Sequence, residues 1–97
     1  MLTGKQKRFL RAKAHHLKPI FQVGKGGVNE NMIKQIVDAL EARELIKVSV
    51  LQNCEEDRHV VADQLAQEAG AELVQVIGNT IVLYKESKEN KQIVLPH

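Results

Sequence analysis

The stretch IFQVGKGGVNENMIKQIVDALEARELIKVSVL, residues 20–51, decides the fold. It opens with a short apolar run, Ile20–Val23, which predicts a strand. The glycine-rich segment at 24–27 then predicts a loop, because glycine adopts backbone conformations that are closed to other residues. Asn29 is a preferred N-cap, and the apolar residues that follow it have helical spacing, so a helix is expected over 30–43. The apolar stripe of this helix comprises Met32, Ile33, Ile36, Val37 and Leu40.

A strand, a third helix and a hairpin are predicted downstream. Leu45–Leu51 is rich in β-branched residues and is typical of a buried strand. The acids at 55–57 complement the positive end of a helix dipole, and Gly70 is a favoured stop, so a helix is expected between them. Gly78 followed by Asn79 predicts a type II′ turn in a hairpin. The two strands that this turn joins are expected at Leu73–Ile77 and Thr80–Tyr84.

Upstream, residues 3–17 predict a helix with two unlike faces. Thr3 and Gln6 have the spacing of a capping box, and Pro19 breaks the helix. One face gathers the apolar residues Leu2, Phe9, Leu10, Ala14 and Leu17. The other face gathers the basic residues Lys5, Lys7, Arg8 and Arg11.

The expected element order is therefore α-β-α-β-α-β-β, which predicts a two-layer α/β domain with a mixed four-stranded sheet. The two strand-helix-strand crossovers predict parallel strand pairs with right-handed connections, and the last strand is expected to run antiparallel. A chain of 97 residues is enough for one domain. We expect that domain to cover residues 1–85 and to be followed by a charged tail, 86–97, whose structure the sequence leaves open.

Composition points to an ordinary soluble protein, with 43% hydrophobic and 27% charged residues. Cys54 is the single cysteine, which fits a reducing compartment. Neither a signal peptide nor a membrane-spanning run is found in the sequence. A cytoplasmic monomer without contact to a membrane is therefore expected.

The charge of the chain is polarised along the sequence. Residues 1–27 carry seven basic side chains and no acid, whereas residues 28–97 carry seven basic and twelve acidic ones, a formal charge of −5. One basic face is the pattern expected for a polyanionic partner. A helix face that is merely solvated would give the same pattern.

The segment Gly24-Lys25-Gly26-Gly27 is a GxxG loop between a strand and a helix N-terminus. Glycines let a phosphate approach the amides of the first helical turn, and Lys25 adds a mobile charge, so the loop can clamp a nucleic-acid backbone. A tight turn is the plain structural alternative. The spacing fits neither a P-loop nor the G-x-G-x-x-G pattern of dinucleotide-binding proteins. The aromatic residues all lie in apolar patterns, which favours recognition of the backbone of structured RNA over base stacking; they are Phe9, Phe21 and Tyr84.

No catalytic constellation, metal site or cofactor site is predicted. His15 and His16 have no cysteine or carboxylate at ligand spacing, so they are interpreted as capping or RNA-adjacent polar residues. Cys54 has no histidine at the spacing of a known nucleophile motif. The acids at 55–57 could bind Mg²⁺, but acids that open a helix more often complement its dipole.

Three blocks of the sequence resemble one family. They are LRAKAHHLKPIFQVGKGGVN from Leu10, ALEARELIKVSV from Ala39 and VQVIGNTIVLYK from Val74. In this order they resemble the CRM domain (chloroplast RNA splicing and ribosome maturation), and the length is similar to that of stand-alone bacterial YhbY-like members. The resemblance implies a fold like the C-terminal domain of translation initiation factor three. It also implies a non-catalytic RNA-binding protein that associates with precursors of the large ribosomal subunit.

The same resemblance assigns the candidate RNA-binding residues. The loop is formed by Gly24, Lys25, Gly26 and Gly27. The basic helix and the residues after it would flank this loop, through Lys5, Lys7, Arg8, Arg11 and Lys18. The family often has arginine at the end of the last strand, where this chain has Lys85, which keeps the charge but loses bidentate phosphate geometry. The alternative function is a protein-interaction module whose basic face meets an acidic protein.

Overall fold

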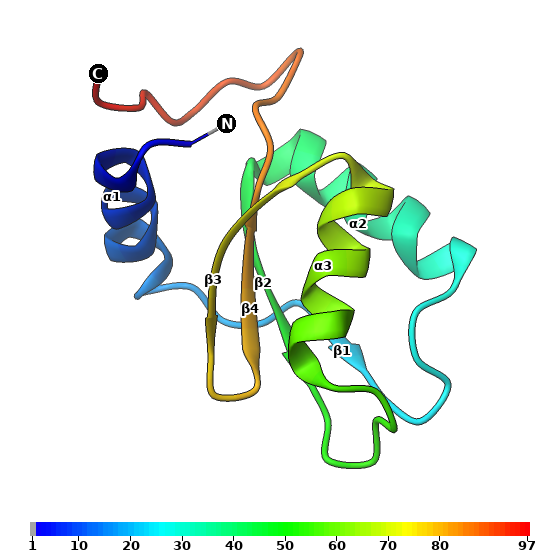
Figure 1. The fold of residues 1–97 in the computed structure, drawn as a ribbon. Coiled ribbons are helices and arrows are strands. Elements are labelled where there is room, and N and C mark those ends of the chain that lie inside the picture. Colours follow the sequence, from blue (N-terminus) through cyan, green and yellow to red (C-terminus); the bar gives the residue numbers. More distant parts are fainter. Residues whose placement is uncertain (1) are drawn as a thin grey trace.

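A computed structural model describes residues 2–97 of the chain, and its seven elements follow the predicted order (Figure 1). The helices are α1 (Gly4–Ala14), α2 (Glu30–Arg43) and α3 (Arg58–Ala69). The strands are β1 (Phe21–Val23), β2 (Leu45–Val50), β3 (Glu72–Ile77) and β4 (Thr80–Tyr84).

Each helix begins at a side-chain cap. Thr3 and Gln6 form the predicted capping box on α1, with distances of 3.0 and 3.1 Å between backbone nitrogen and side-chain oxygen. Asn29 caps α2, its Oδ1 accepting a hydrogen bond from the Met32 amide at 2.9 Å. Asp57 caps α3, so this helix starts after the acidic run instead of within it. The caps satisfy amides that have no partner inside the helix.

The largest difference in length concerns α1, which ends at Ala14 although a helix to residue 17 was predicted. His15 is its C-cap, and Leu17 then donates its amide to the Ala14 carbonyl as the chain turns toward β1. Leu17 therefore lies beyond the helix and is 37% exposed. The apolar stripe predicts too long a helix because Leu17, its last member, lies in the linker that follows α1.

The strand order in the sheet is β1-β2-β4-β3, with β1 and β2 parallel and the other two pairs antiparallel. Strands β2 and β3 run in the same direction, as their helical crossover predicts, but they do not pair because β4 lies between them. The hairpin turns back at Gly78, and this places β4 next to β2, between β2 and β3. Gly78 has φ +56°, as the first position of a type II′ turn requires.

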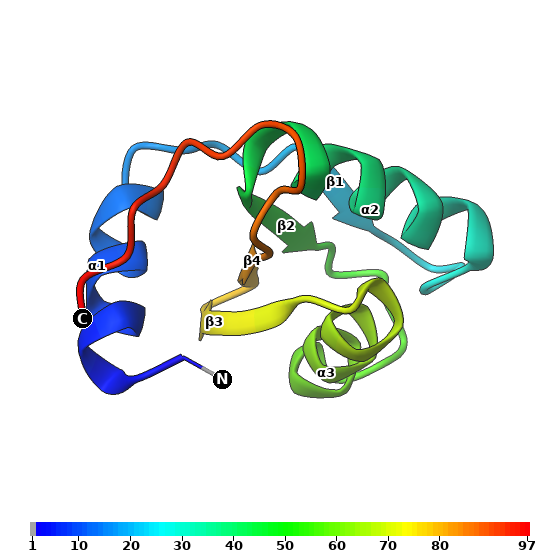
Figure 2. The same ribbon diagram turned by 90° about the horizontal axis from the view of Figure 1, so that it is seen from above.

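Helices lie on both faces of the sheet, and only one face is covered along its whole length (Figures 1 and 2). Helices α2 and α3 pack on one face and form the larger apolar cluster, in which Ile36, Leu40 and Leu65 are fully buried. Helix α1 packs on the opposite face, where Leu10 joins a second cluster with Val82. The predicted two layers correspond to the sheet with α2 and α3, and α1 adds a partial third layer.

The C-terminal segment, residues 85–97, is irregular but packed. Two carboxylates hold it: Glu44 Oε2 accepts the Ser87 amide at 2.8 Å, and Glu41 accepts the amides of Lys88 and Glu89. Ile93, like Leu95, then packs against the α1 cluster. None of the helices in residues 2–97 has the length and hydropathy that crossing a membrane requires.

Candidate functional site

The GxxG segment forms a tight turn between β1 and α2. The Gly27 amide donates to the Gly24 carbonyl at 3.0 Å, and Gly27 has φ +68°. Lys25 and Gly26 form the exposed apex of this turn. Within residues 2–97 the amides of these two residues make no hydrogen bond. The apex therefore presents two free donors and a lysine side chain to solvent.

Space around the turn differs from one glycine to the next. A Cβ added at Gly26 would meet no heavy atom within 4 Å, and Gly26 does not have positive φ. A Cβ at Gly24 would approach the Asn53 Oδ1 to 3.4 Å, because the loop after β2 lies alongside. The steric and conformational need for glycine is thus strongest at Gly24 and Gly27, whereas Gly26 keeps the apex bare.

The N-terminus of α2 is less open to an anion than the sequence suggests. The side chain of Asn29 already takes the Met32 amide, and Glu30 brings a carboxylate into the first turn. Both features complement the positive end of the helix dipole. A phosphate at this loop would thus be held by the apex of the turn more than by the helix terminus.

The structure does not bring the basic helix and the GxxG loop together. Helix α1 lies on one side of the sheet, and the loop leads into α2 on the other side, at the far end of the molecule in both views (Figures 1 and 2). On α1, Lys5 and Arg8 are exposed while Lys7 and Arg11 are half-buried. Lys18 is exposed in the linker that joins α1 to β1.

Lys85 has a structural contact that the sequence did not indicate. Its Nζ donates to the Ala69 carbonyl at 3.4 Å, at the C-terminal end of α3. A cation at this position satisfies a free carbonyl and complements the helix dipole. The GxxG loop lies at the opposite end of the sheet (Figure 1).

A largely polar surface of the sheet lies between the basic helix α1 and the GxxG loop. Helix α1 covers only the end of the sheet face that carries Leu45 and Tyr84. Strand register places the side chains of the uncovered half on the same face, and they include no carboxylate. We call this surface the open sheet face; it comprises Gln22, Lys47, Ser49, Gln75, Ile77 and Thr80.

Sequence reasoning missed the open sheet face because β2 was read as uniformly buried. In LIKVSV, Lys47 and Ser49 alternate with the buried Val48 and Val50. This alternation was the available signal, since a period of two marks a strand with one solvated face. The Nζ of Lys47 also donates to the Leu17 carbonyl at 3.0 Å, which ties the linker to the edge of this surface.

Residues considered for metal binding or catalysis are not gathered. His15 and His16 contact each other edge to face, with ring centroids 5.5 Å apart. Cys54 is a free, partly buried thiol. Across the part of the chain that the structure describes, no three His, Cys, Asp or Glu side chains are placed to hold a metal ion.

Comparisons with known proteins agree on one family. The family model described as "CRS1 / YhbY (CRM) domain" matches residues 2–85. "Probable RNA-binding protein YqeI" of Bacillus subtilis is 80% identical over 96 residues, covering 99% of this chain and all of the relative. "RNA-binding protein" of Haemophilus influenzae is 41% identical over 95 residues, covering 98% and 95% of the two chains. The solution structure of a Staphylococcus aureus protein with 66% identity superimposes with a TM-score of 0.83, covering 99% of this chain and all of that one.

Proposed function

Because the chain belongs to the CRS1/YhbY (CRM) domain family, we propose that it is a non-catalytic RNA-binding protein. In this proposal it acts as a cytoplasmic monomer on ribosomal RNA in precursors of the large ribosomal subunit. Two relatives carry names that describe them as RNA-binding. The polarised charge of the chain supports the same function, since cations that neutralise phosphates supply most of the affinity for nucleic acids.

The observation that carries the proposal is the open sheet face, whose side chains include no carboxylate. In this proposal the RNA runs from α1 over the open sheet face to the apex at Lys25 and Gly26. Polar uncharged side chains on the sheet can donate to phosphate and ribose oxygens, and the lysines and arginines at each end supply charge. The two regions that are separated in the fold would thus contact successive parts of one RNA.

At the loop, the proposed contact is a phosphate at the apex of the turn. The free amides of Lys25 and Gly26 would donate to its oxygens, while the Lys25 ammonium adds charge. The missing Cβ at Gly26 leaves this approach open. Such a contact reads no base, so the loop would position the RNA backbone without selecting its sequence.

The variant Gly26→Asp tests this function. A carboxylate at the apex would repel the phosphate and occupy its path, so RNA affinity should fall by about tenfold or more. The fold should be retained, because a side chain at this position meets no neighbour. Affinity is measured by fluorescence anisotropy with a fragment of large-subunit ribosomal RNA, and folding by circular dichroism.

Gly26→Ala is the matched control, because it adds a Cβ without a charge. It should bind more tightly than the aspartate variant. If the folded aspartate variant binds as tightly as the parent chain, the loop is only a turn. If the parent chain itself binds no RNA, the proposed function is wrong.

A further inference from the structure

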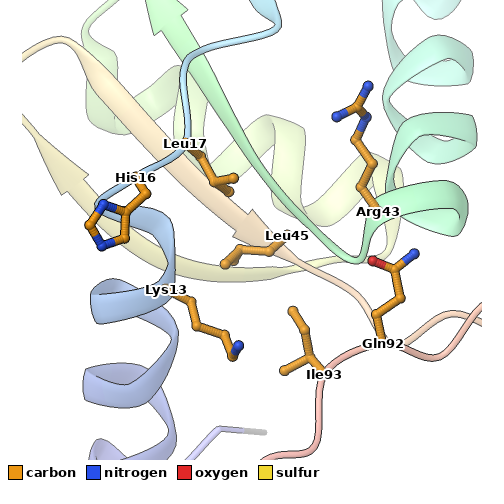
Figure 3. Close-up of a pocket in the computed structure, with 7 residues that line it drawn as sticks. All are labelled: Lys13, His16, Leu17, Arg43, Leu45, Gln92 and Ile93. Atoms are coloured by element: carbon orange, nitrogen blue, oxygen red, sulfur yellow. The ribbon is translucent and has the colours of Figure 1, made fainter.

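A hollow of about 440 Å³ opens on the edge of the molecule, away from the GxxG loop (Figure 3). Lys13 and Leu17 border it on the α1 side, Arg43 at the end of α2, Leu45 at the start of β2 and Ile93 in the C-terminal segment. We call it the lateral hollow. Its volume lies within the range of about 300–1000 Å³ that is typical of small-molecule sites.

The lining of the lateral hollow combines cations with an apolar wall. Lys13 and Arg43 approach it from opposite sides, and neither makes an ion pair within residues 2–97. No carboxylate lines the hollow. Leu17, Leu45 and Ile93 lie between the two cations in Figure 3 and supply apolar surface. This combination suits a ligand that has a flat apolar part in the middle and a negative charge on each side.

The edge of β2 adds a pair of hydrogen-bonding groups. The Lys85 amide donates to the Glu44 carbonyl, and the Ile20 amide donates to the Lys47 carbonyl. Along a strand, the N–H and C=O groups of successive residues are directed to alternate sides. The carbonyl of Glu44 is directed toward β4 and that of Lys47 away from it, so the amide and carbonyl of Leu45 are also directed away from β4. Strand β1 starts opposite Val48, and within residues 2–97 the Leu45 amide and carbonyl have no main-chain partner.

The wall formed by the C-terminal segment is fixed in place. Glu44 Oε1 accepts the amides of Gln92 and Ile93 at 2.6 and 2.8 Å, next to the hollow. These bonds, with that from the Ser87 amide, also disperse the negative charge of Glu44. A wall that is already ordered costs no conformational entropy when a ligand binds.

A second hollow of about 190 Å³ adjoins the first and shares Leu17, Arg43 and Leu45 with it. It continues past the exposed side chains of Lys18 and Ile20 toward β1. A ligand seated in the lateral hollow could therefore extend along the linker. Such continuity favours one unit of a polymer over an isolated small molecule.

We propose that the lateral hollow binds an unpaired nucleotide of an RNA strand, with its base on Leu17, Leu45 and Ile93 and the phosphates on its two sides toward Lys13 and Arg43. The amide and carbonyl of Leu45 pair with a base edge that offers an acceptor and a donor. The strand continues along the linker through the smaller hollow. This inference rests on the proposed function and adds a single-stranded element to the RNA that the chain recognises.

The experiment compares a blunt RNA duplex with the same duplex carrying a short unpaired 3′ extension. Burial of one base against apolar side chains and its hydrogen bonds to Leu45 both stabilise the complex. The extension should therefore raise the affinity of the parent chain by about tenfold, measured by fluorescence anisotropy at one salt concentration. The double variant Lys13→Gln/Arg43→Gln should lose this gain.

Lys34→Gln/Lys88→Gln is the matched control, since it removes the same charge at two exposed positions outside the hollow. It should keep the gain. If the parent binds both RNAs equally, or if the Lys13/Arg43 variant keeps the gain, the inference is wrong while RNA binding stands. If the parent binds neither RNA, the proposed function fails with it.

A second measurement does not depend on any variant. Backbone amide signals of Leu45 and Ile93 are followed by NMR in the parent chain, first with the extended RNA and then with free nucleoside 5′-monophosphates. Shifts with the extended RNA that are absent with the blunt duplex support the inference. Shifts with free nucleotides alone would assign the hollow to a small metabolite and overturn it.

Discussion

At the scale of single residues, Glu44 has the least ordinary environment in the structure. It is fully buried and has φ +66°, a conformation that side chains rarely adopt. Burial raises the pKa of its carboxyl, but hydrogen bonds from the amides of Ser87, Gln92 and Ile93 outweigh this effect and leave the pKa lowered. The strained backbone of Glu44 thus occurs where its carboxylate and its carbonyl both accept hydrogen bonds from the C-terminal segment.

This arrangement predicts an acid-sensitive C-terminal segment. Hydrogen bonds from the Lys88 and Glu89 amides lower the pKa of the Glu41 carboxyl. Hydrogen bonds to Glu44 lower the pKa of its carboxyl in the same way. A lowered pKa contributes stability above the ordinary value near 4.5, and the contribution is lost as the pH falls through the folded-state pKa. The Tm should therefore drop, and the amide signals of Gln92 and Ile93 should move to coil positions, below about pH 4.5.

Glu44→Gln provides the comparison for this effect. Losing a buried charged acceptor should cost roughly 1.5–3 kcal/mol at pH 7. The variant should also show a flatter dependence of Tm on pH in the acid range. Parallel curves for parent and variant would show that Glu44 does not contribute to the acid sensitivity.

At the scale of elements, α1 has separate packing and basic faces. Leu10 and Ala14 are buried, whereas Lys5 and Arg8 are exposed on the other side. Exposed charges contribute little to stability. The basic face of α1 can therefore be changed without loss of the fold.

The triple variant Lys7→Gln/Arg8→Gln/Arg11→Gln should weaken RNA binding and lower the Tm only slightly, because glutamine keeps part of the aliphatic stem of the half-buried Lys7 and Arg11. Each phosphate contact that is lost should reduce the slope of log affinity against log salt by about 0.7 to 0.9. The measurement is a salt titration of RNA affinity for parent and variant. An unchanged slope would remove α1 from the proposed interface.

Helix α2 contributes two fully buried side chains to the larger apolar cluster. Ile36→Ala and Leu40→Ala should each lower the free energy of unfolding by about 2–5 kcal/mol, because both side chains are fully buried. Val60→Ala on α3 is the control, since Val60 is 51% exposed and should change stability far less. Urea unfolding measures all three. A small effect at Ile36 would mean that the core adapts around the missing side chain.

Local sequence signals predicted the elements well. The cap at Asn29, the capping box at Thr3 and the stop at Gly70 have mechanisms that act within a few residues, and all are found in the structure. The position of β4 between β2 and β3 depends on contacts between distant strands, which no local signal specifies. The role of Lys85 was missed for the same reason, because its partner Ala69 lies sixteen residues away.

The candidate site was also predicted where its signals are local and missed where it depends on contacts between distant residues. A loop at 24–27 was predicted from its glycines and is found as a tight turn, but the face on which α1 packs was not predicted. A basic helix close to the loop in sequence was therefore expected to flank it in space, and it lies across the sheet (Figure 2). The open sheet face depends on which half of the sheet α1 leaves uncovered. The packing of Leu10 in the smaller cluster with Val74 and Val82 determines which half of the sheet face α1 covers.

At the scale of the whole molecule, the smaller apolar cluster joins the two ends of the chain. It unites Leu10 with Val82, Tyr84 and Ile93, and Gln6 donates its side-chain amide to the Pro96 carbonyl at 3.0 Å. The larger cluster is closed earlier in the sequence, between β1 and β4. The ends therefore depend on each other for burial, although ninety positions separate Gln6 from Pro96.

This closure gives the chain a definite order of assembly during translation. Helix α1 leaves the ribosomal exit tunnel before the other elements of residues 2–97, and strands β3 and β4, which help to bury it, are made last among them. Until those strands emerge, its apolar stripe and its cations are both accessible to whatever lies near the tunnel mouth. Of the three helices in residues 2–97, the one made first is thus the last to dock.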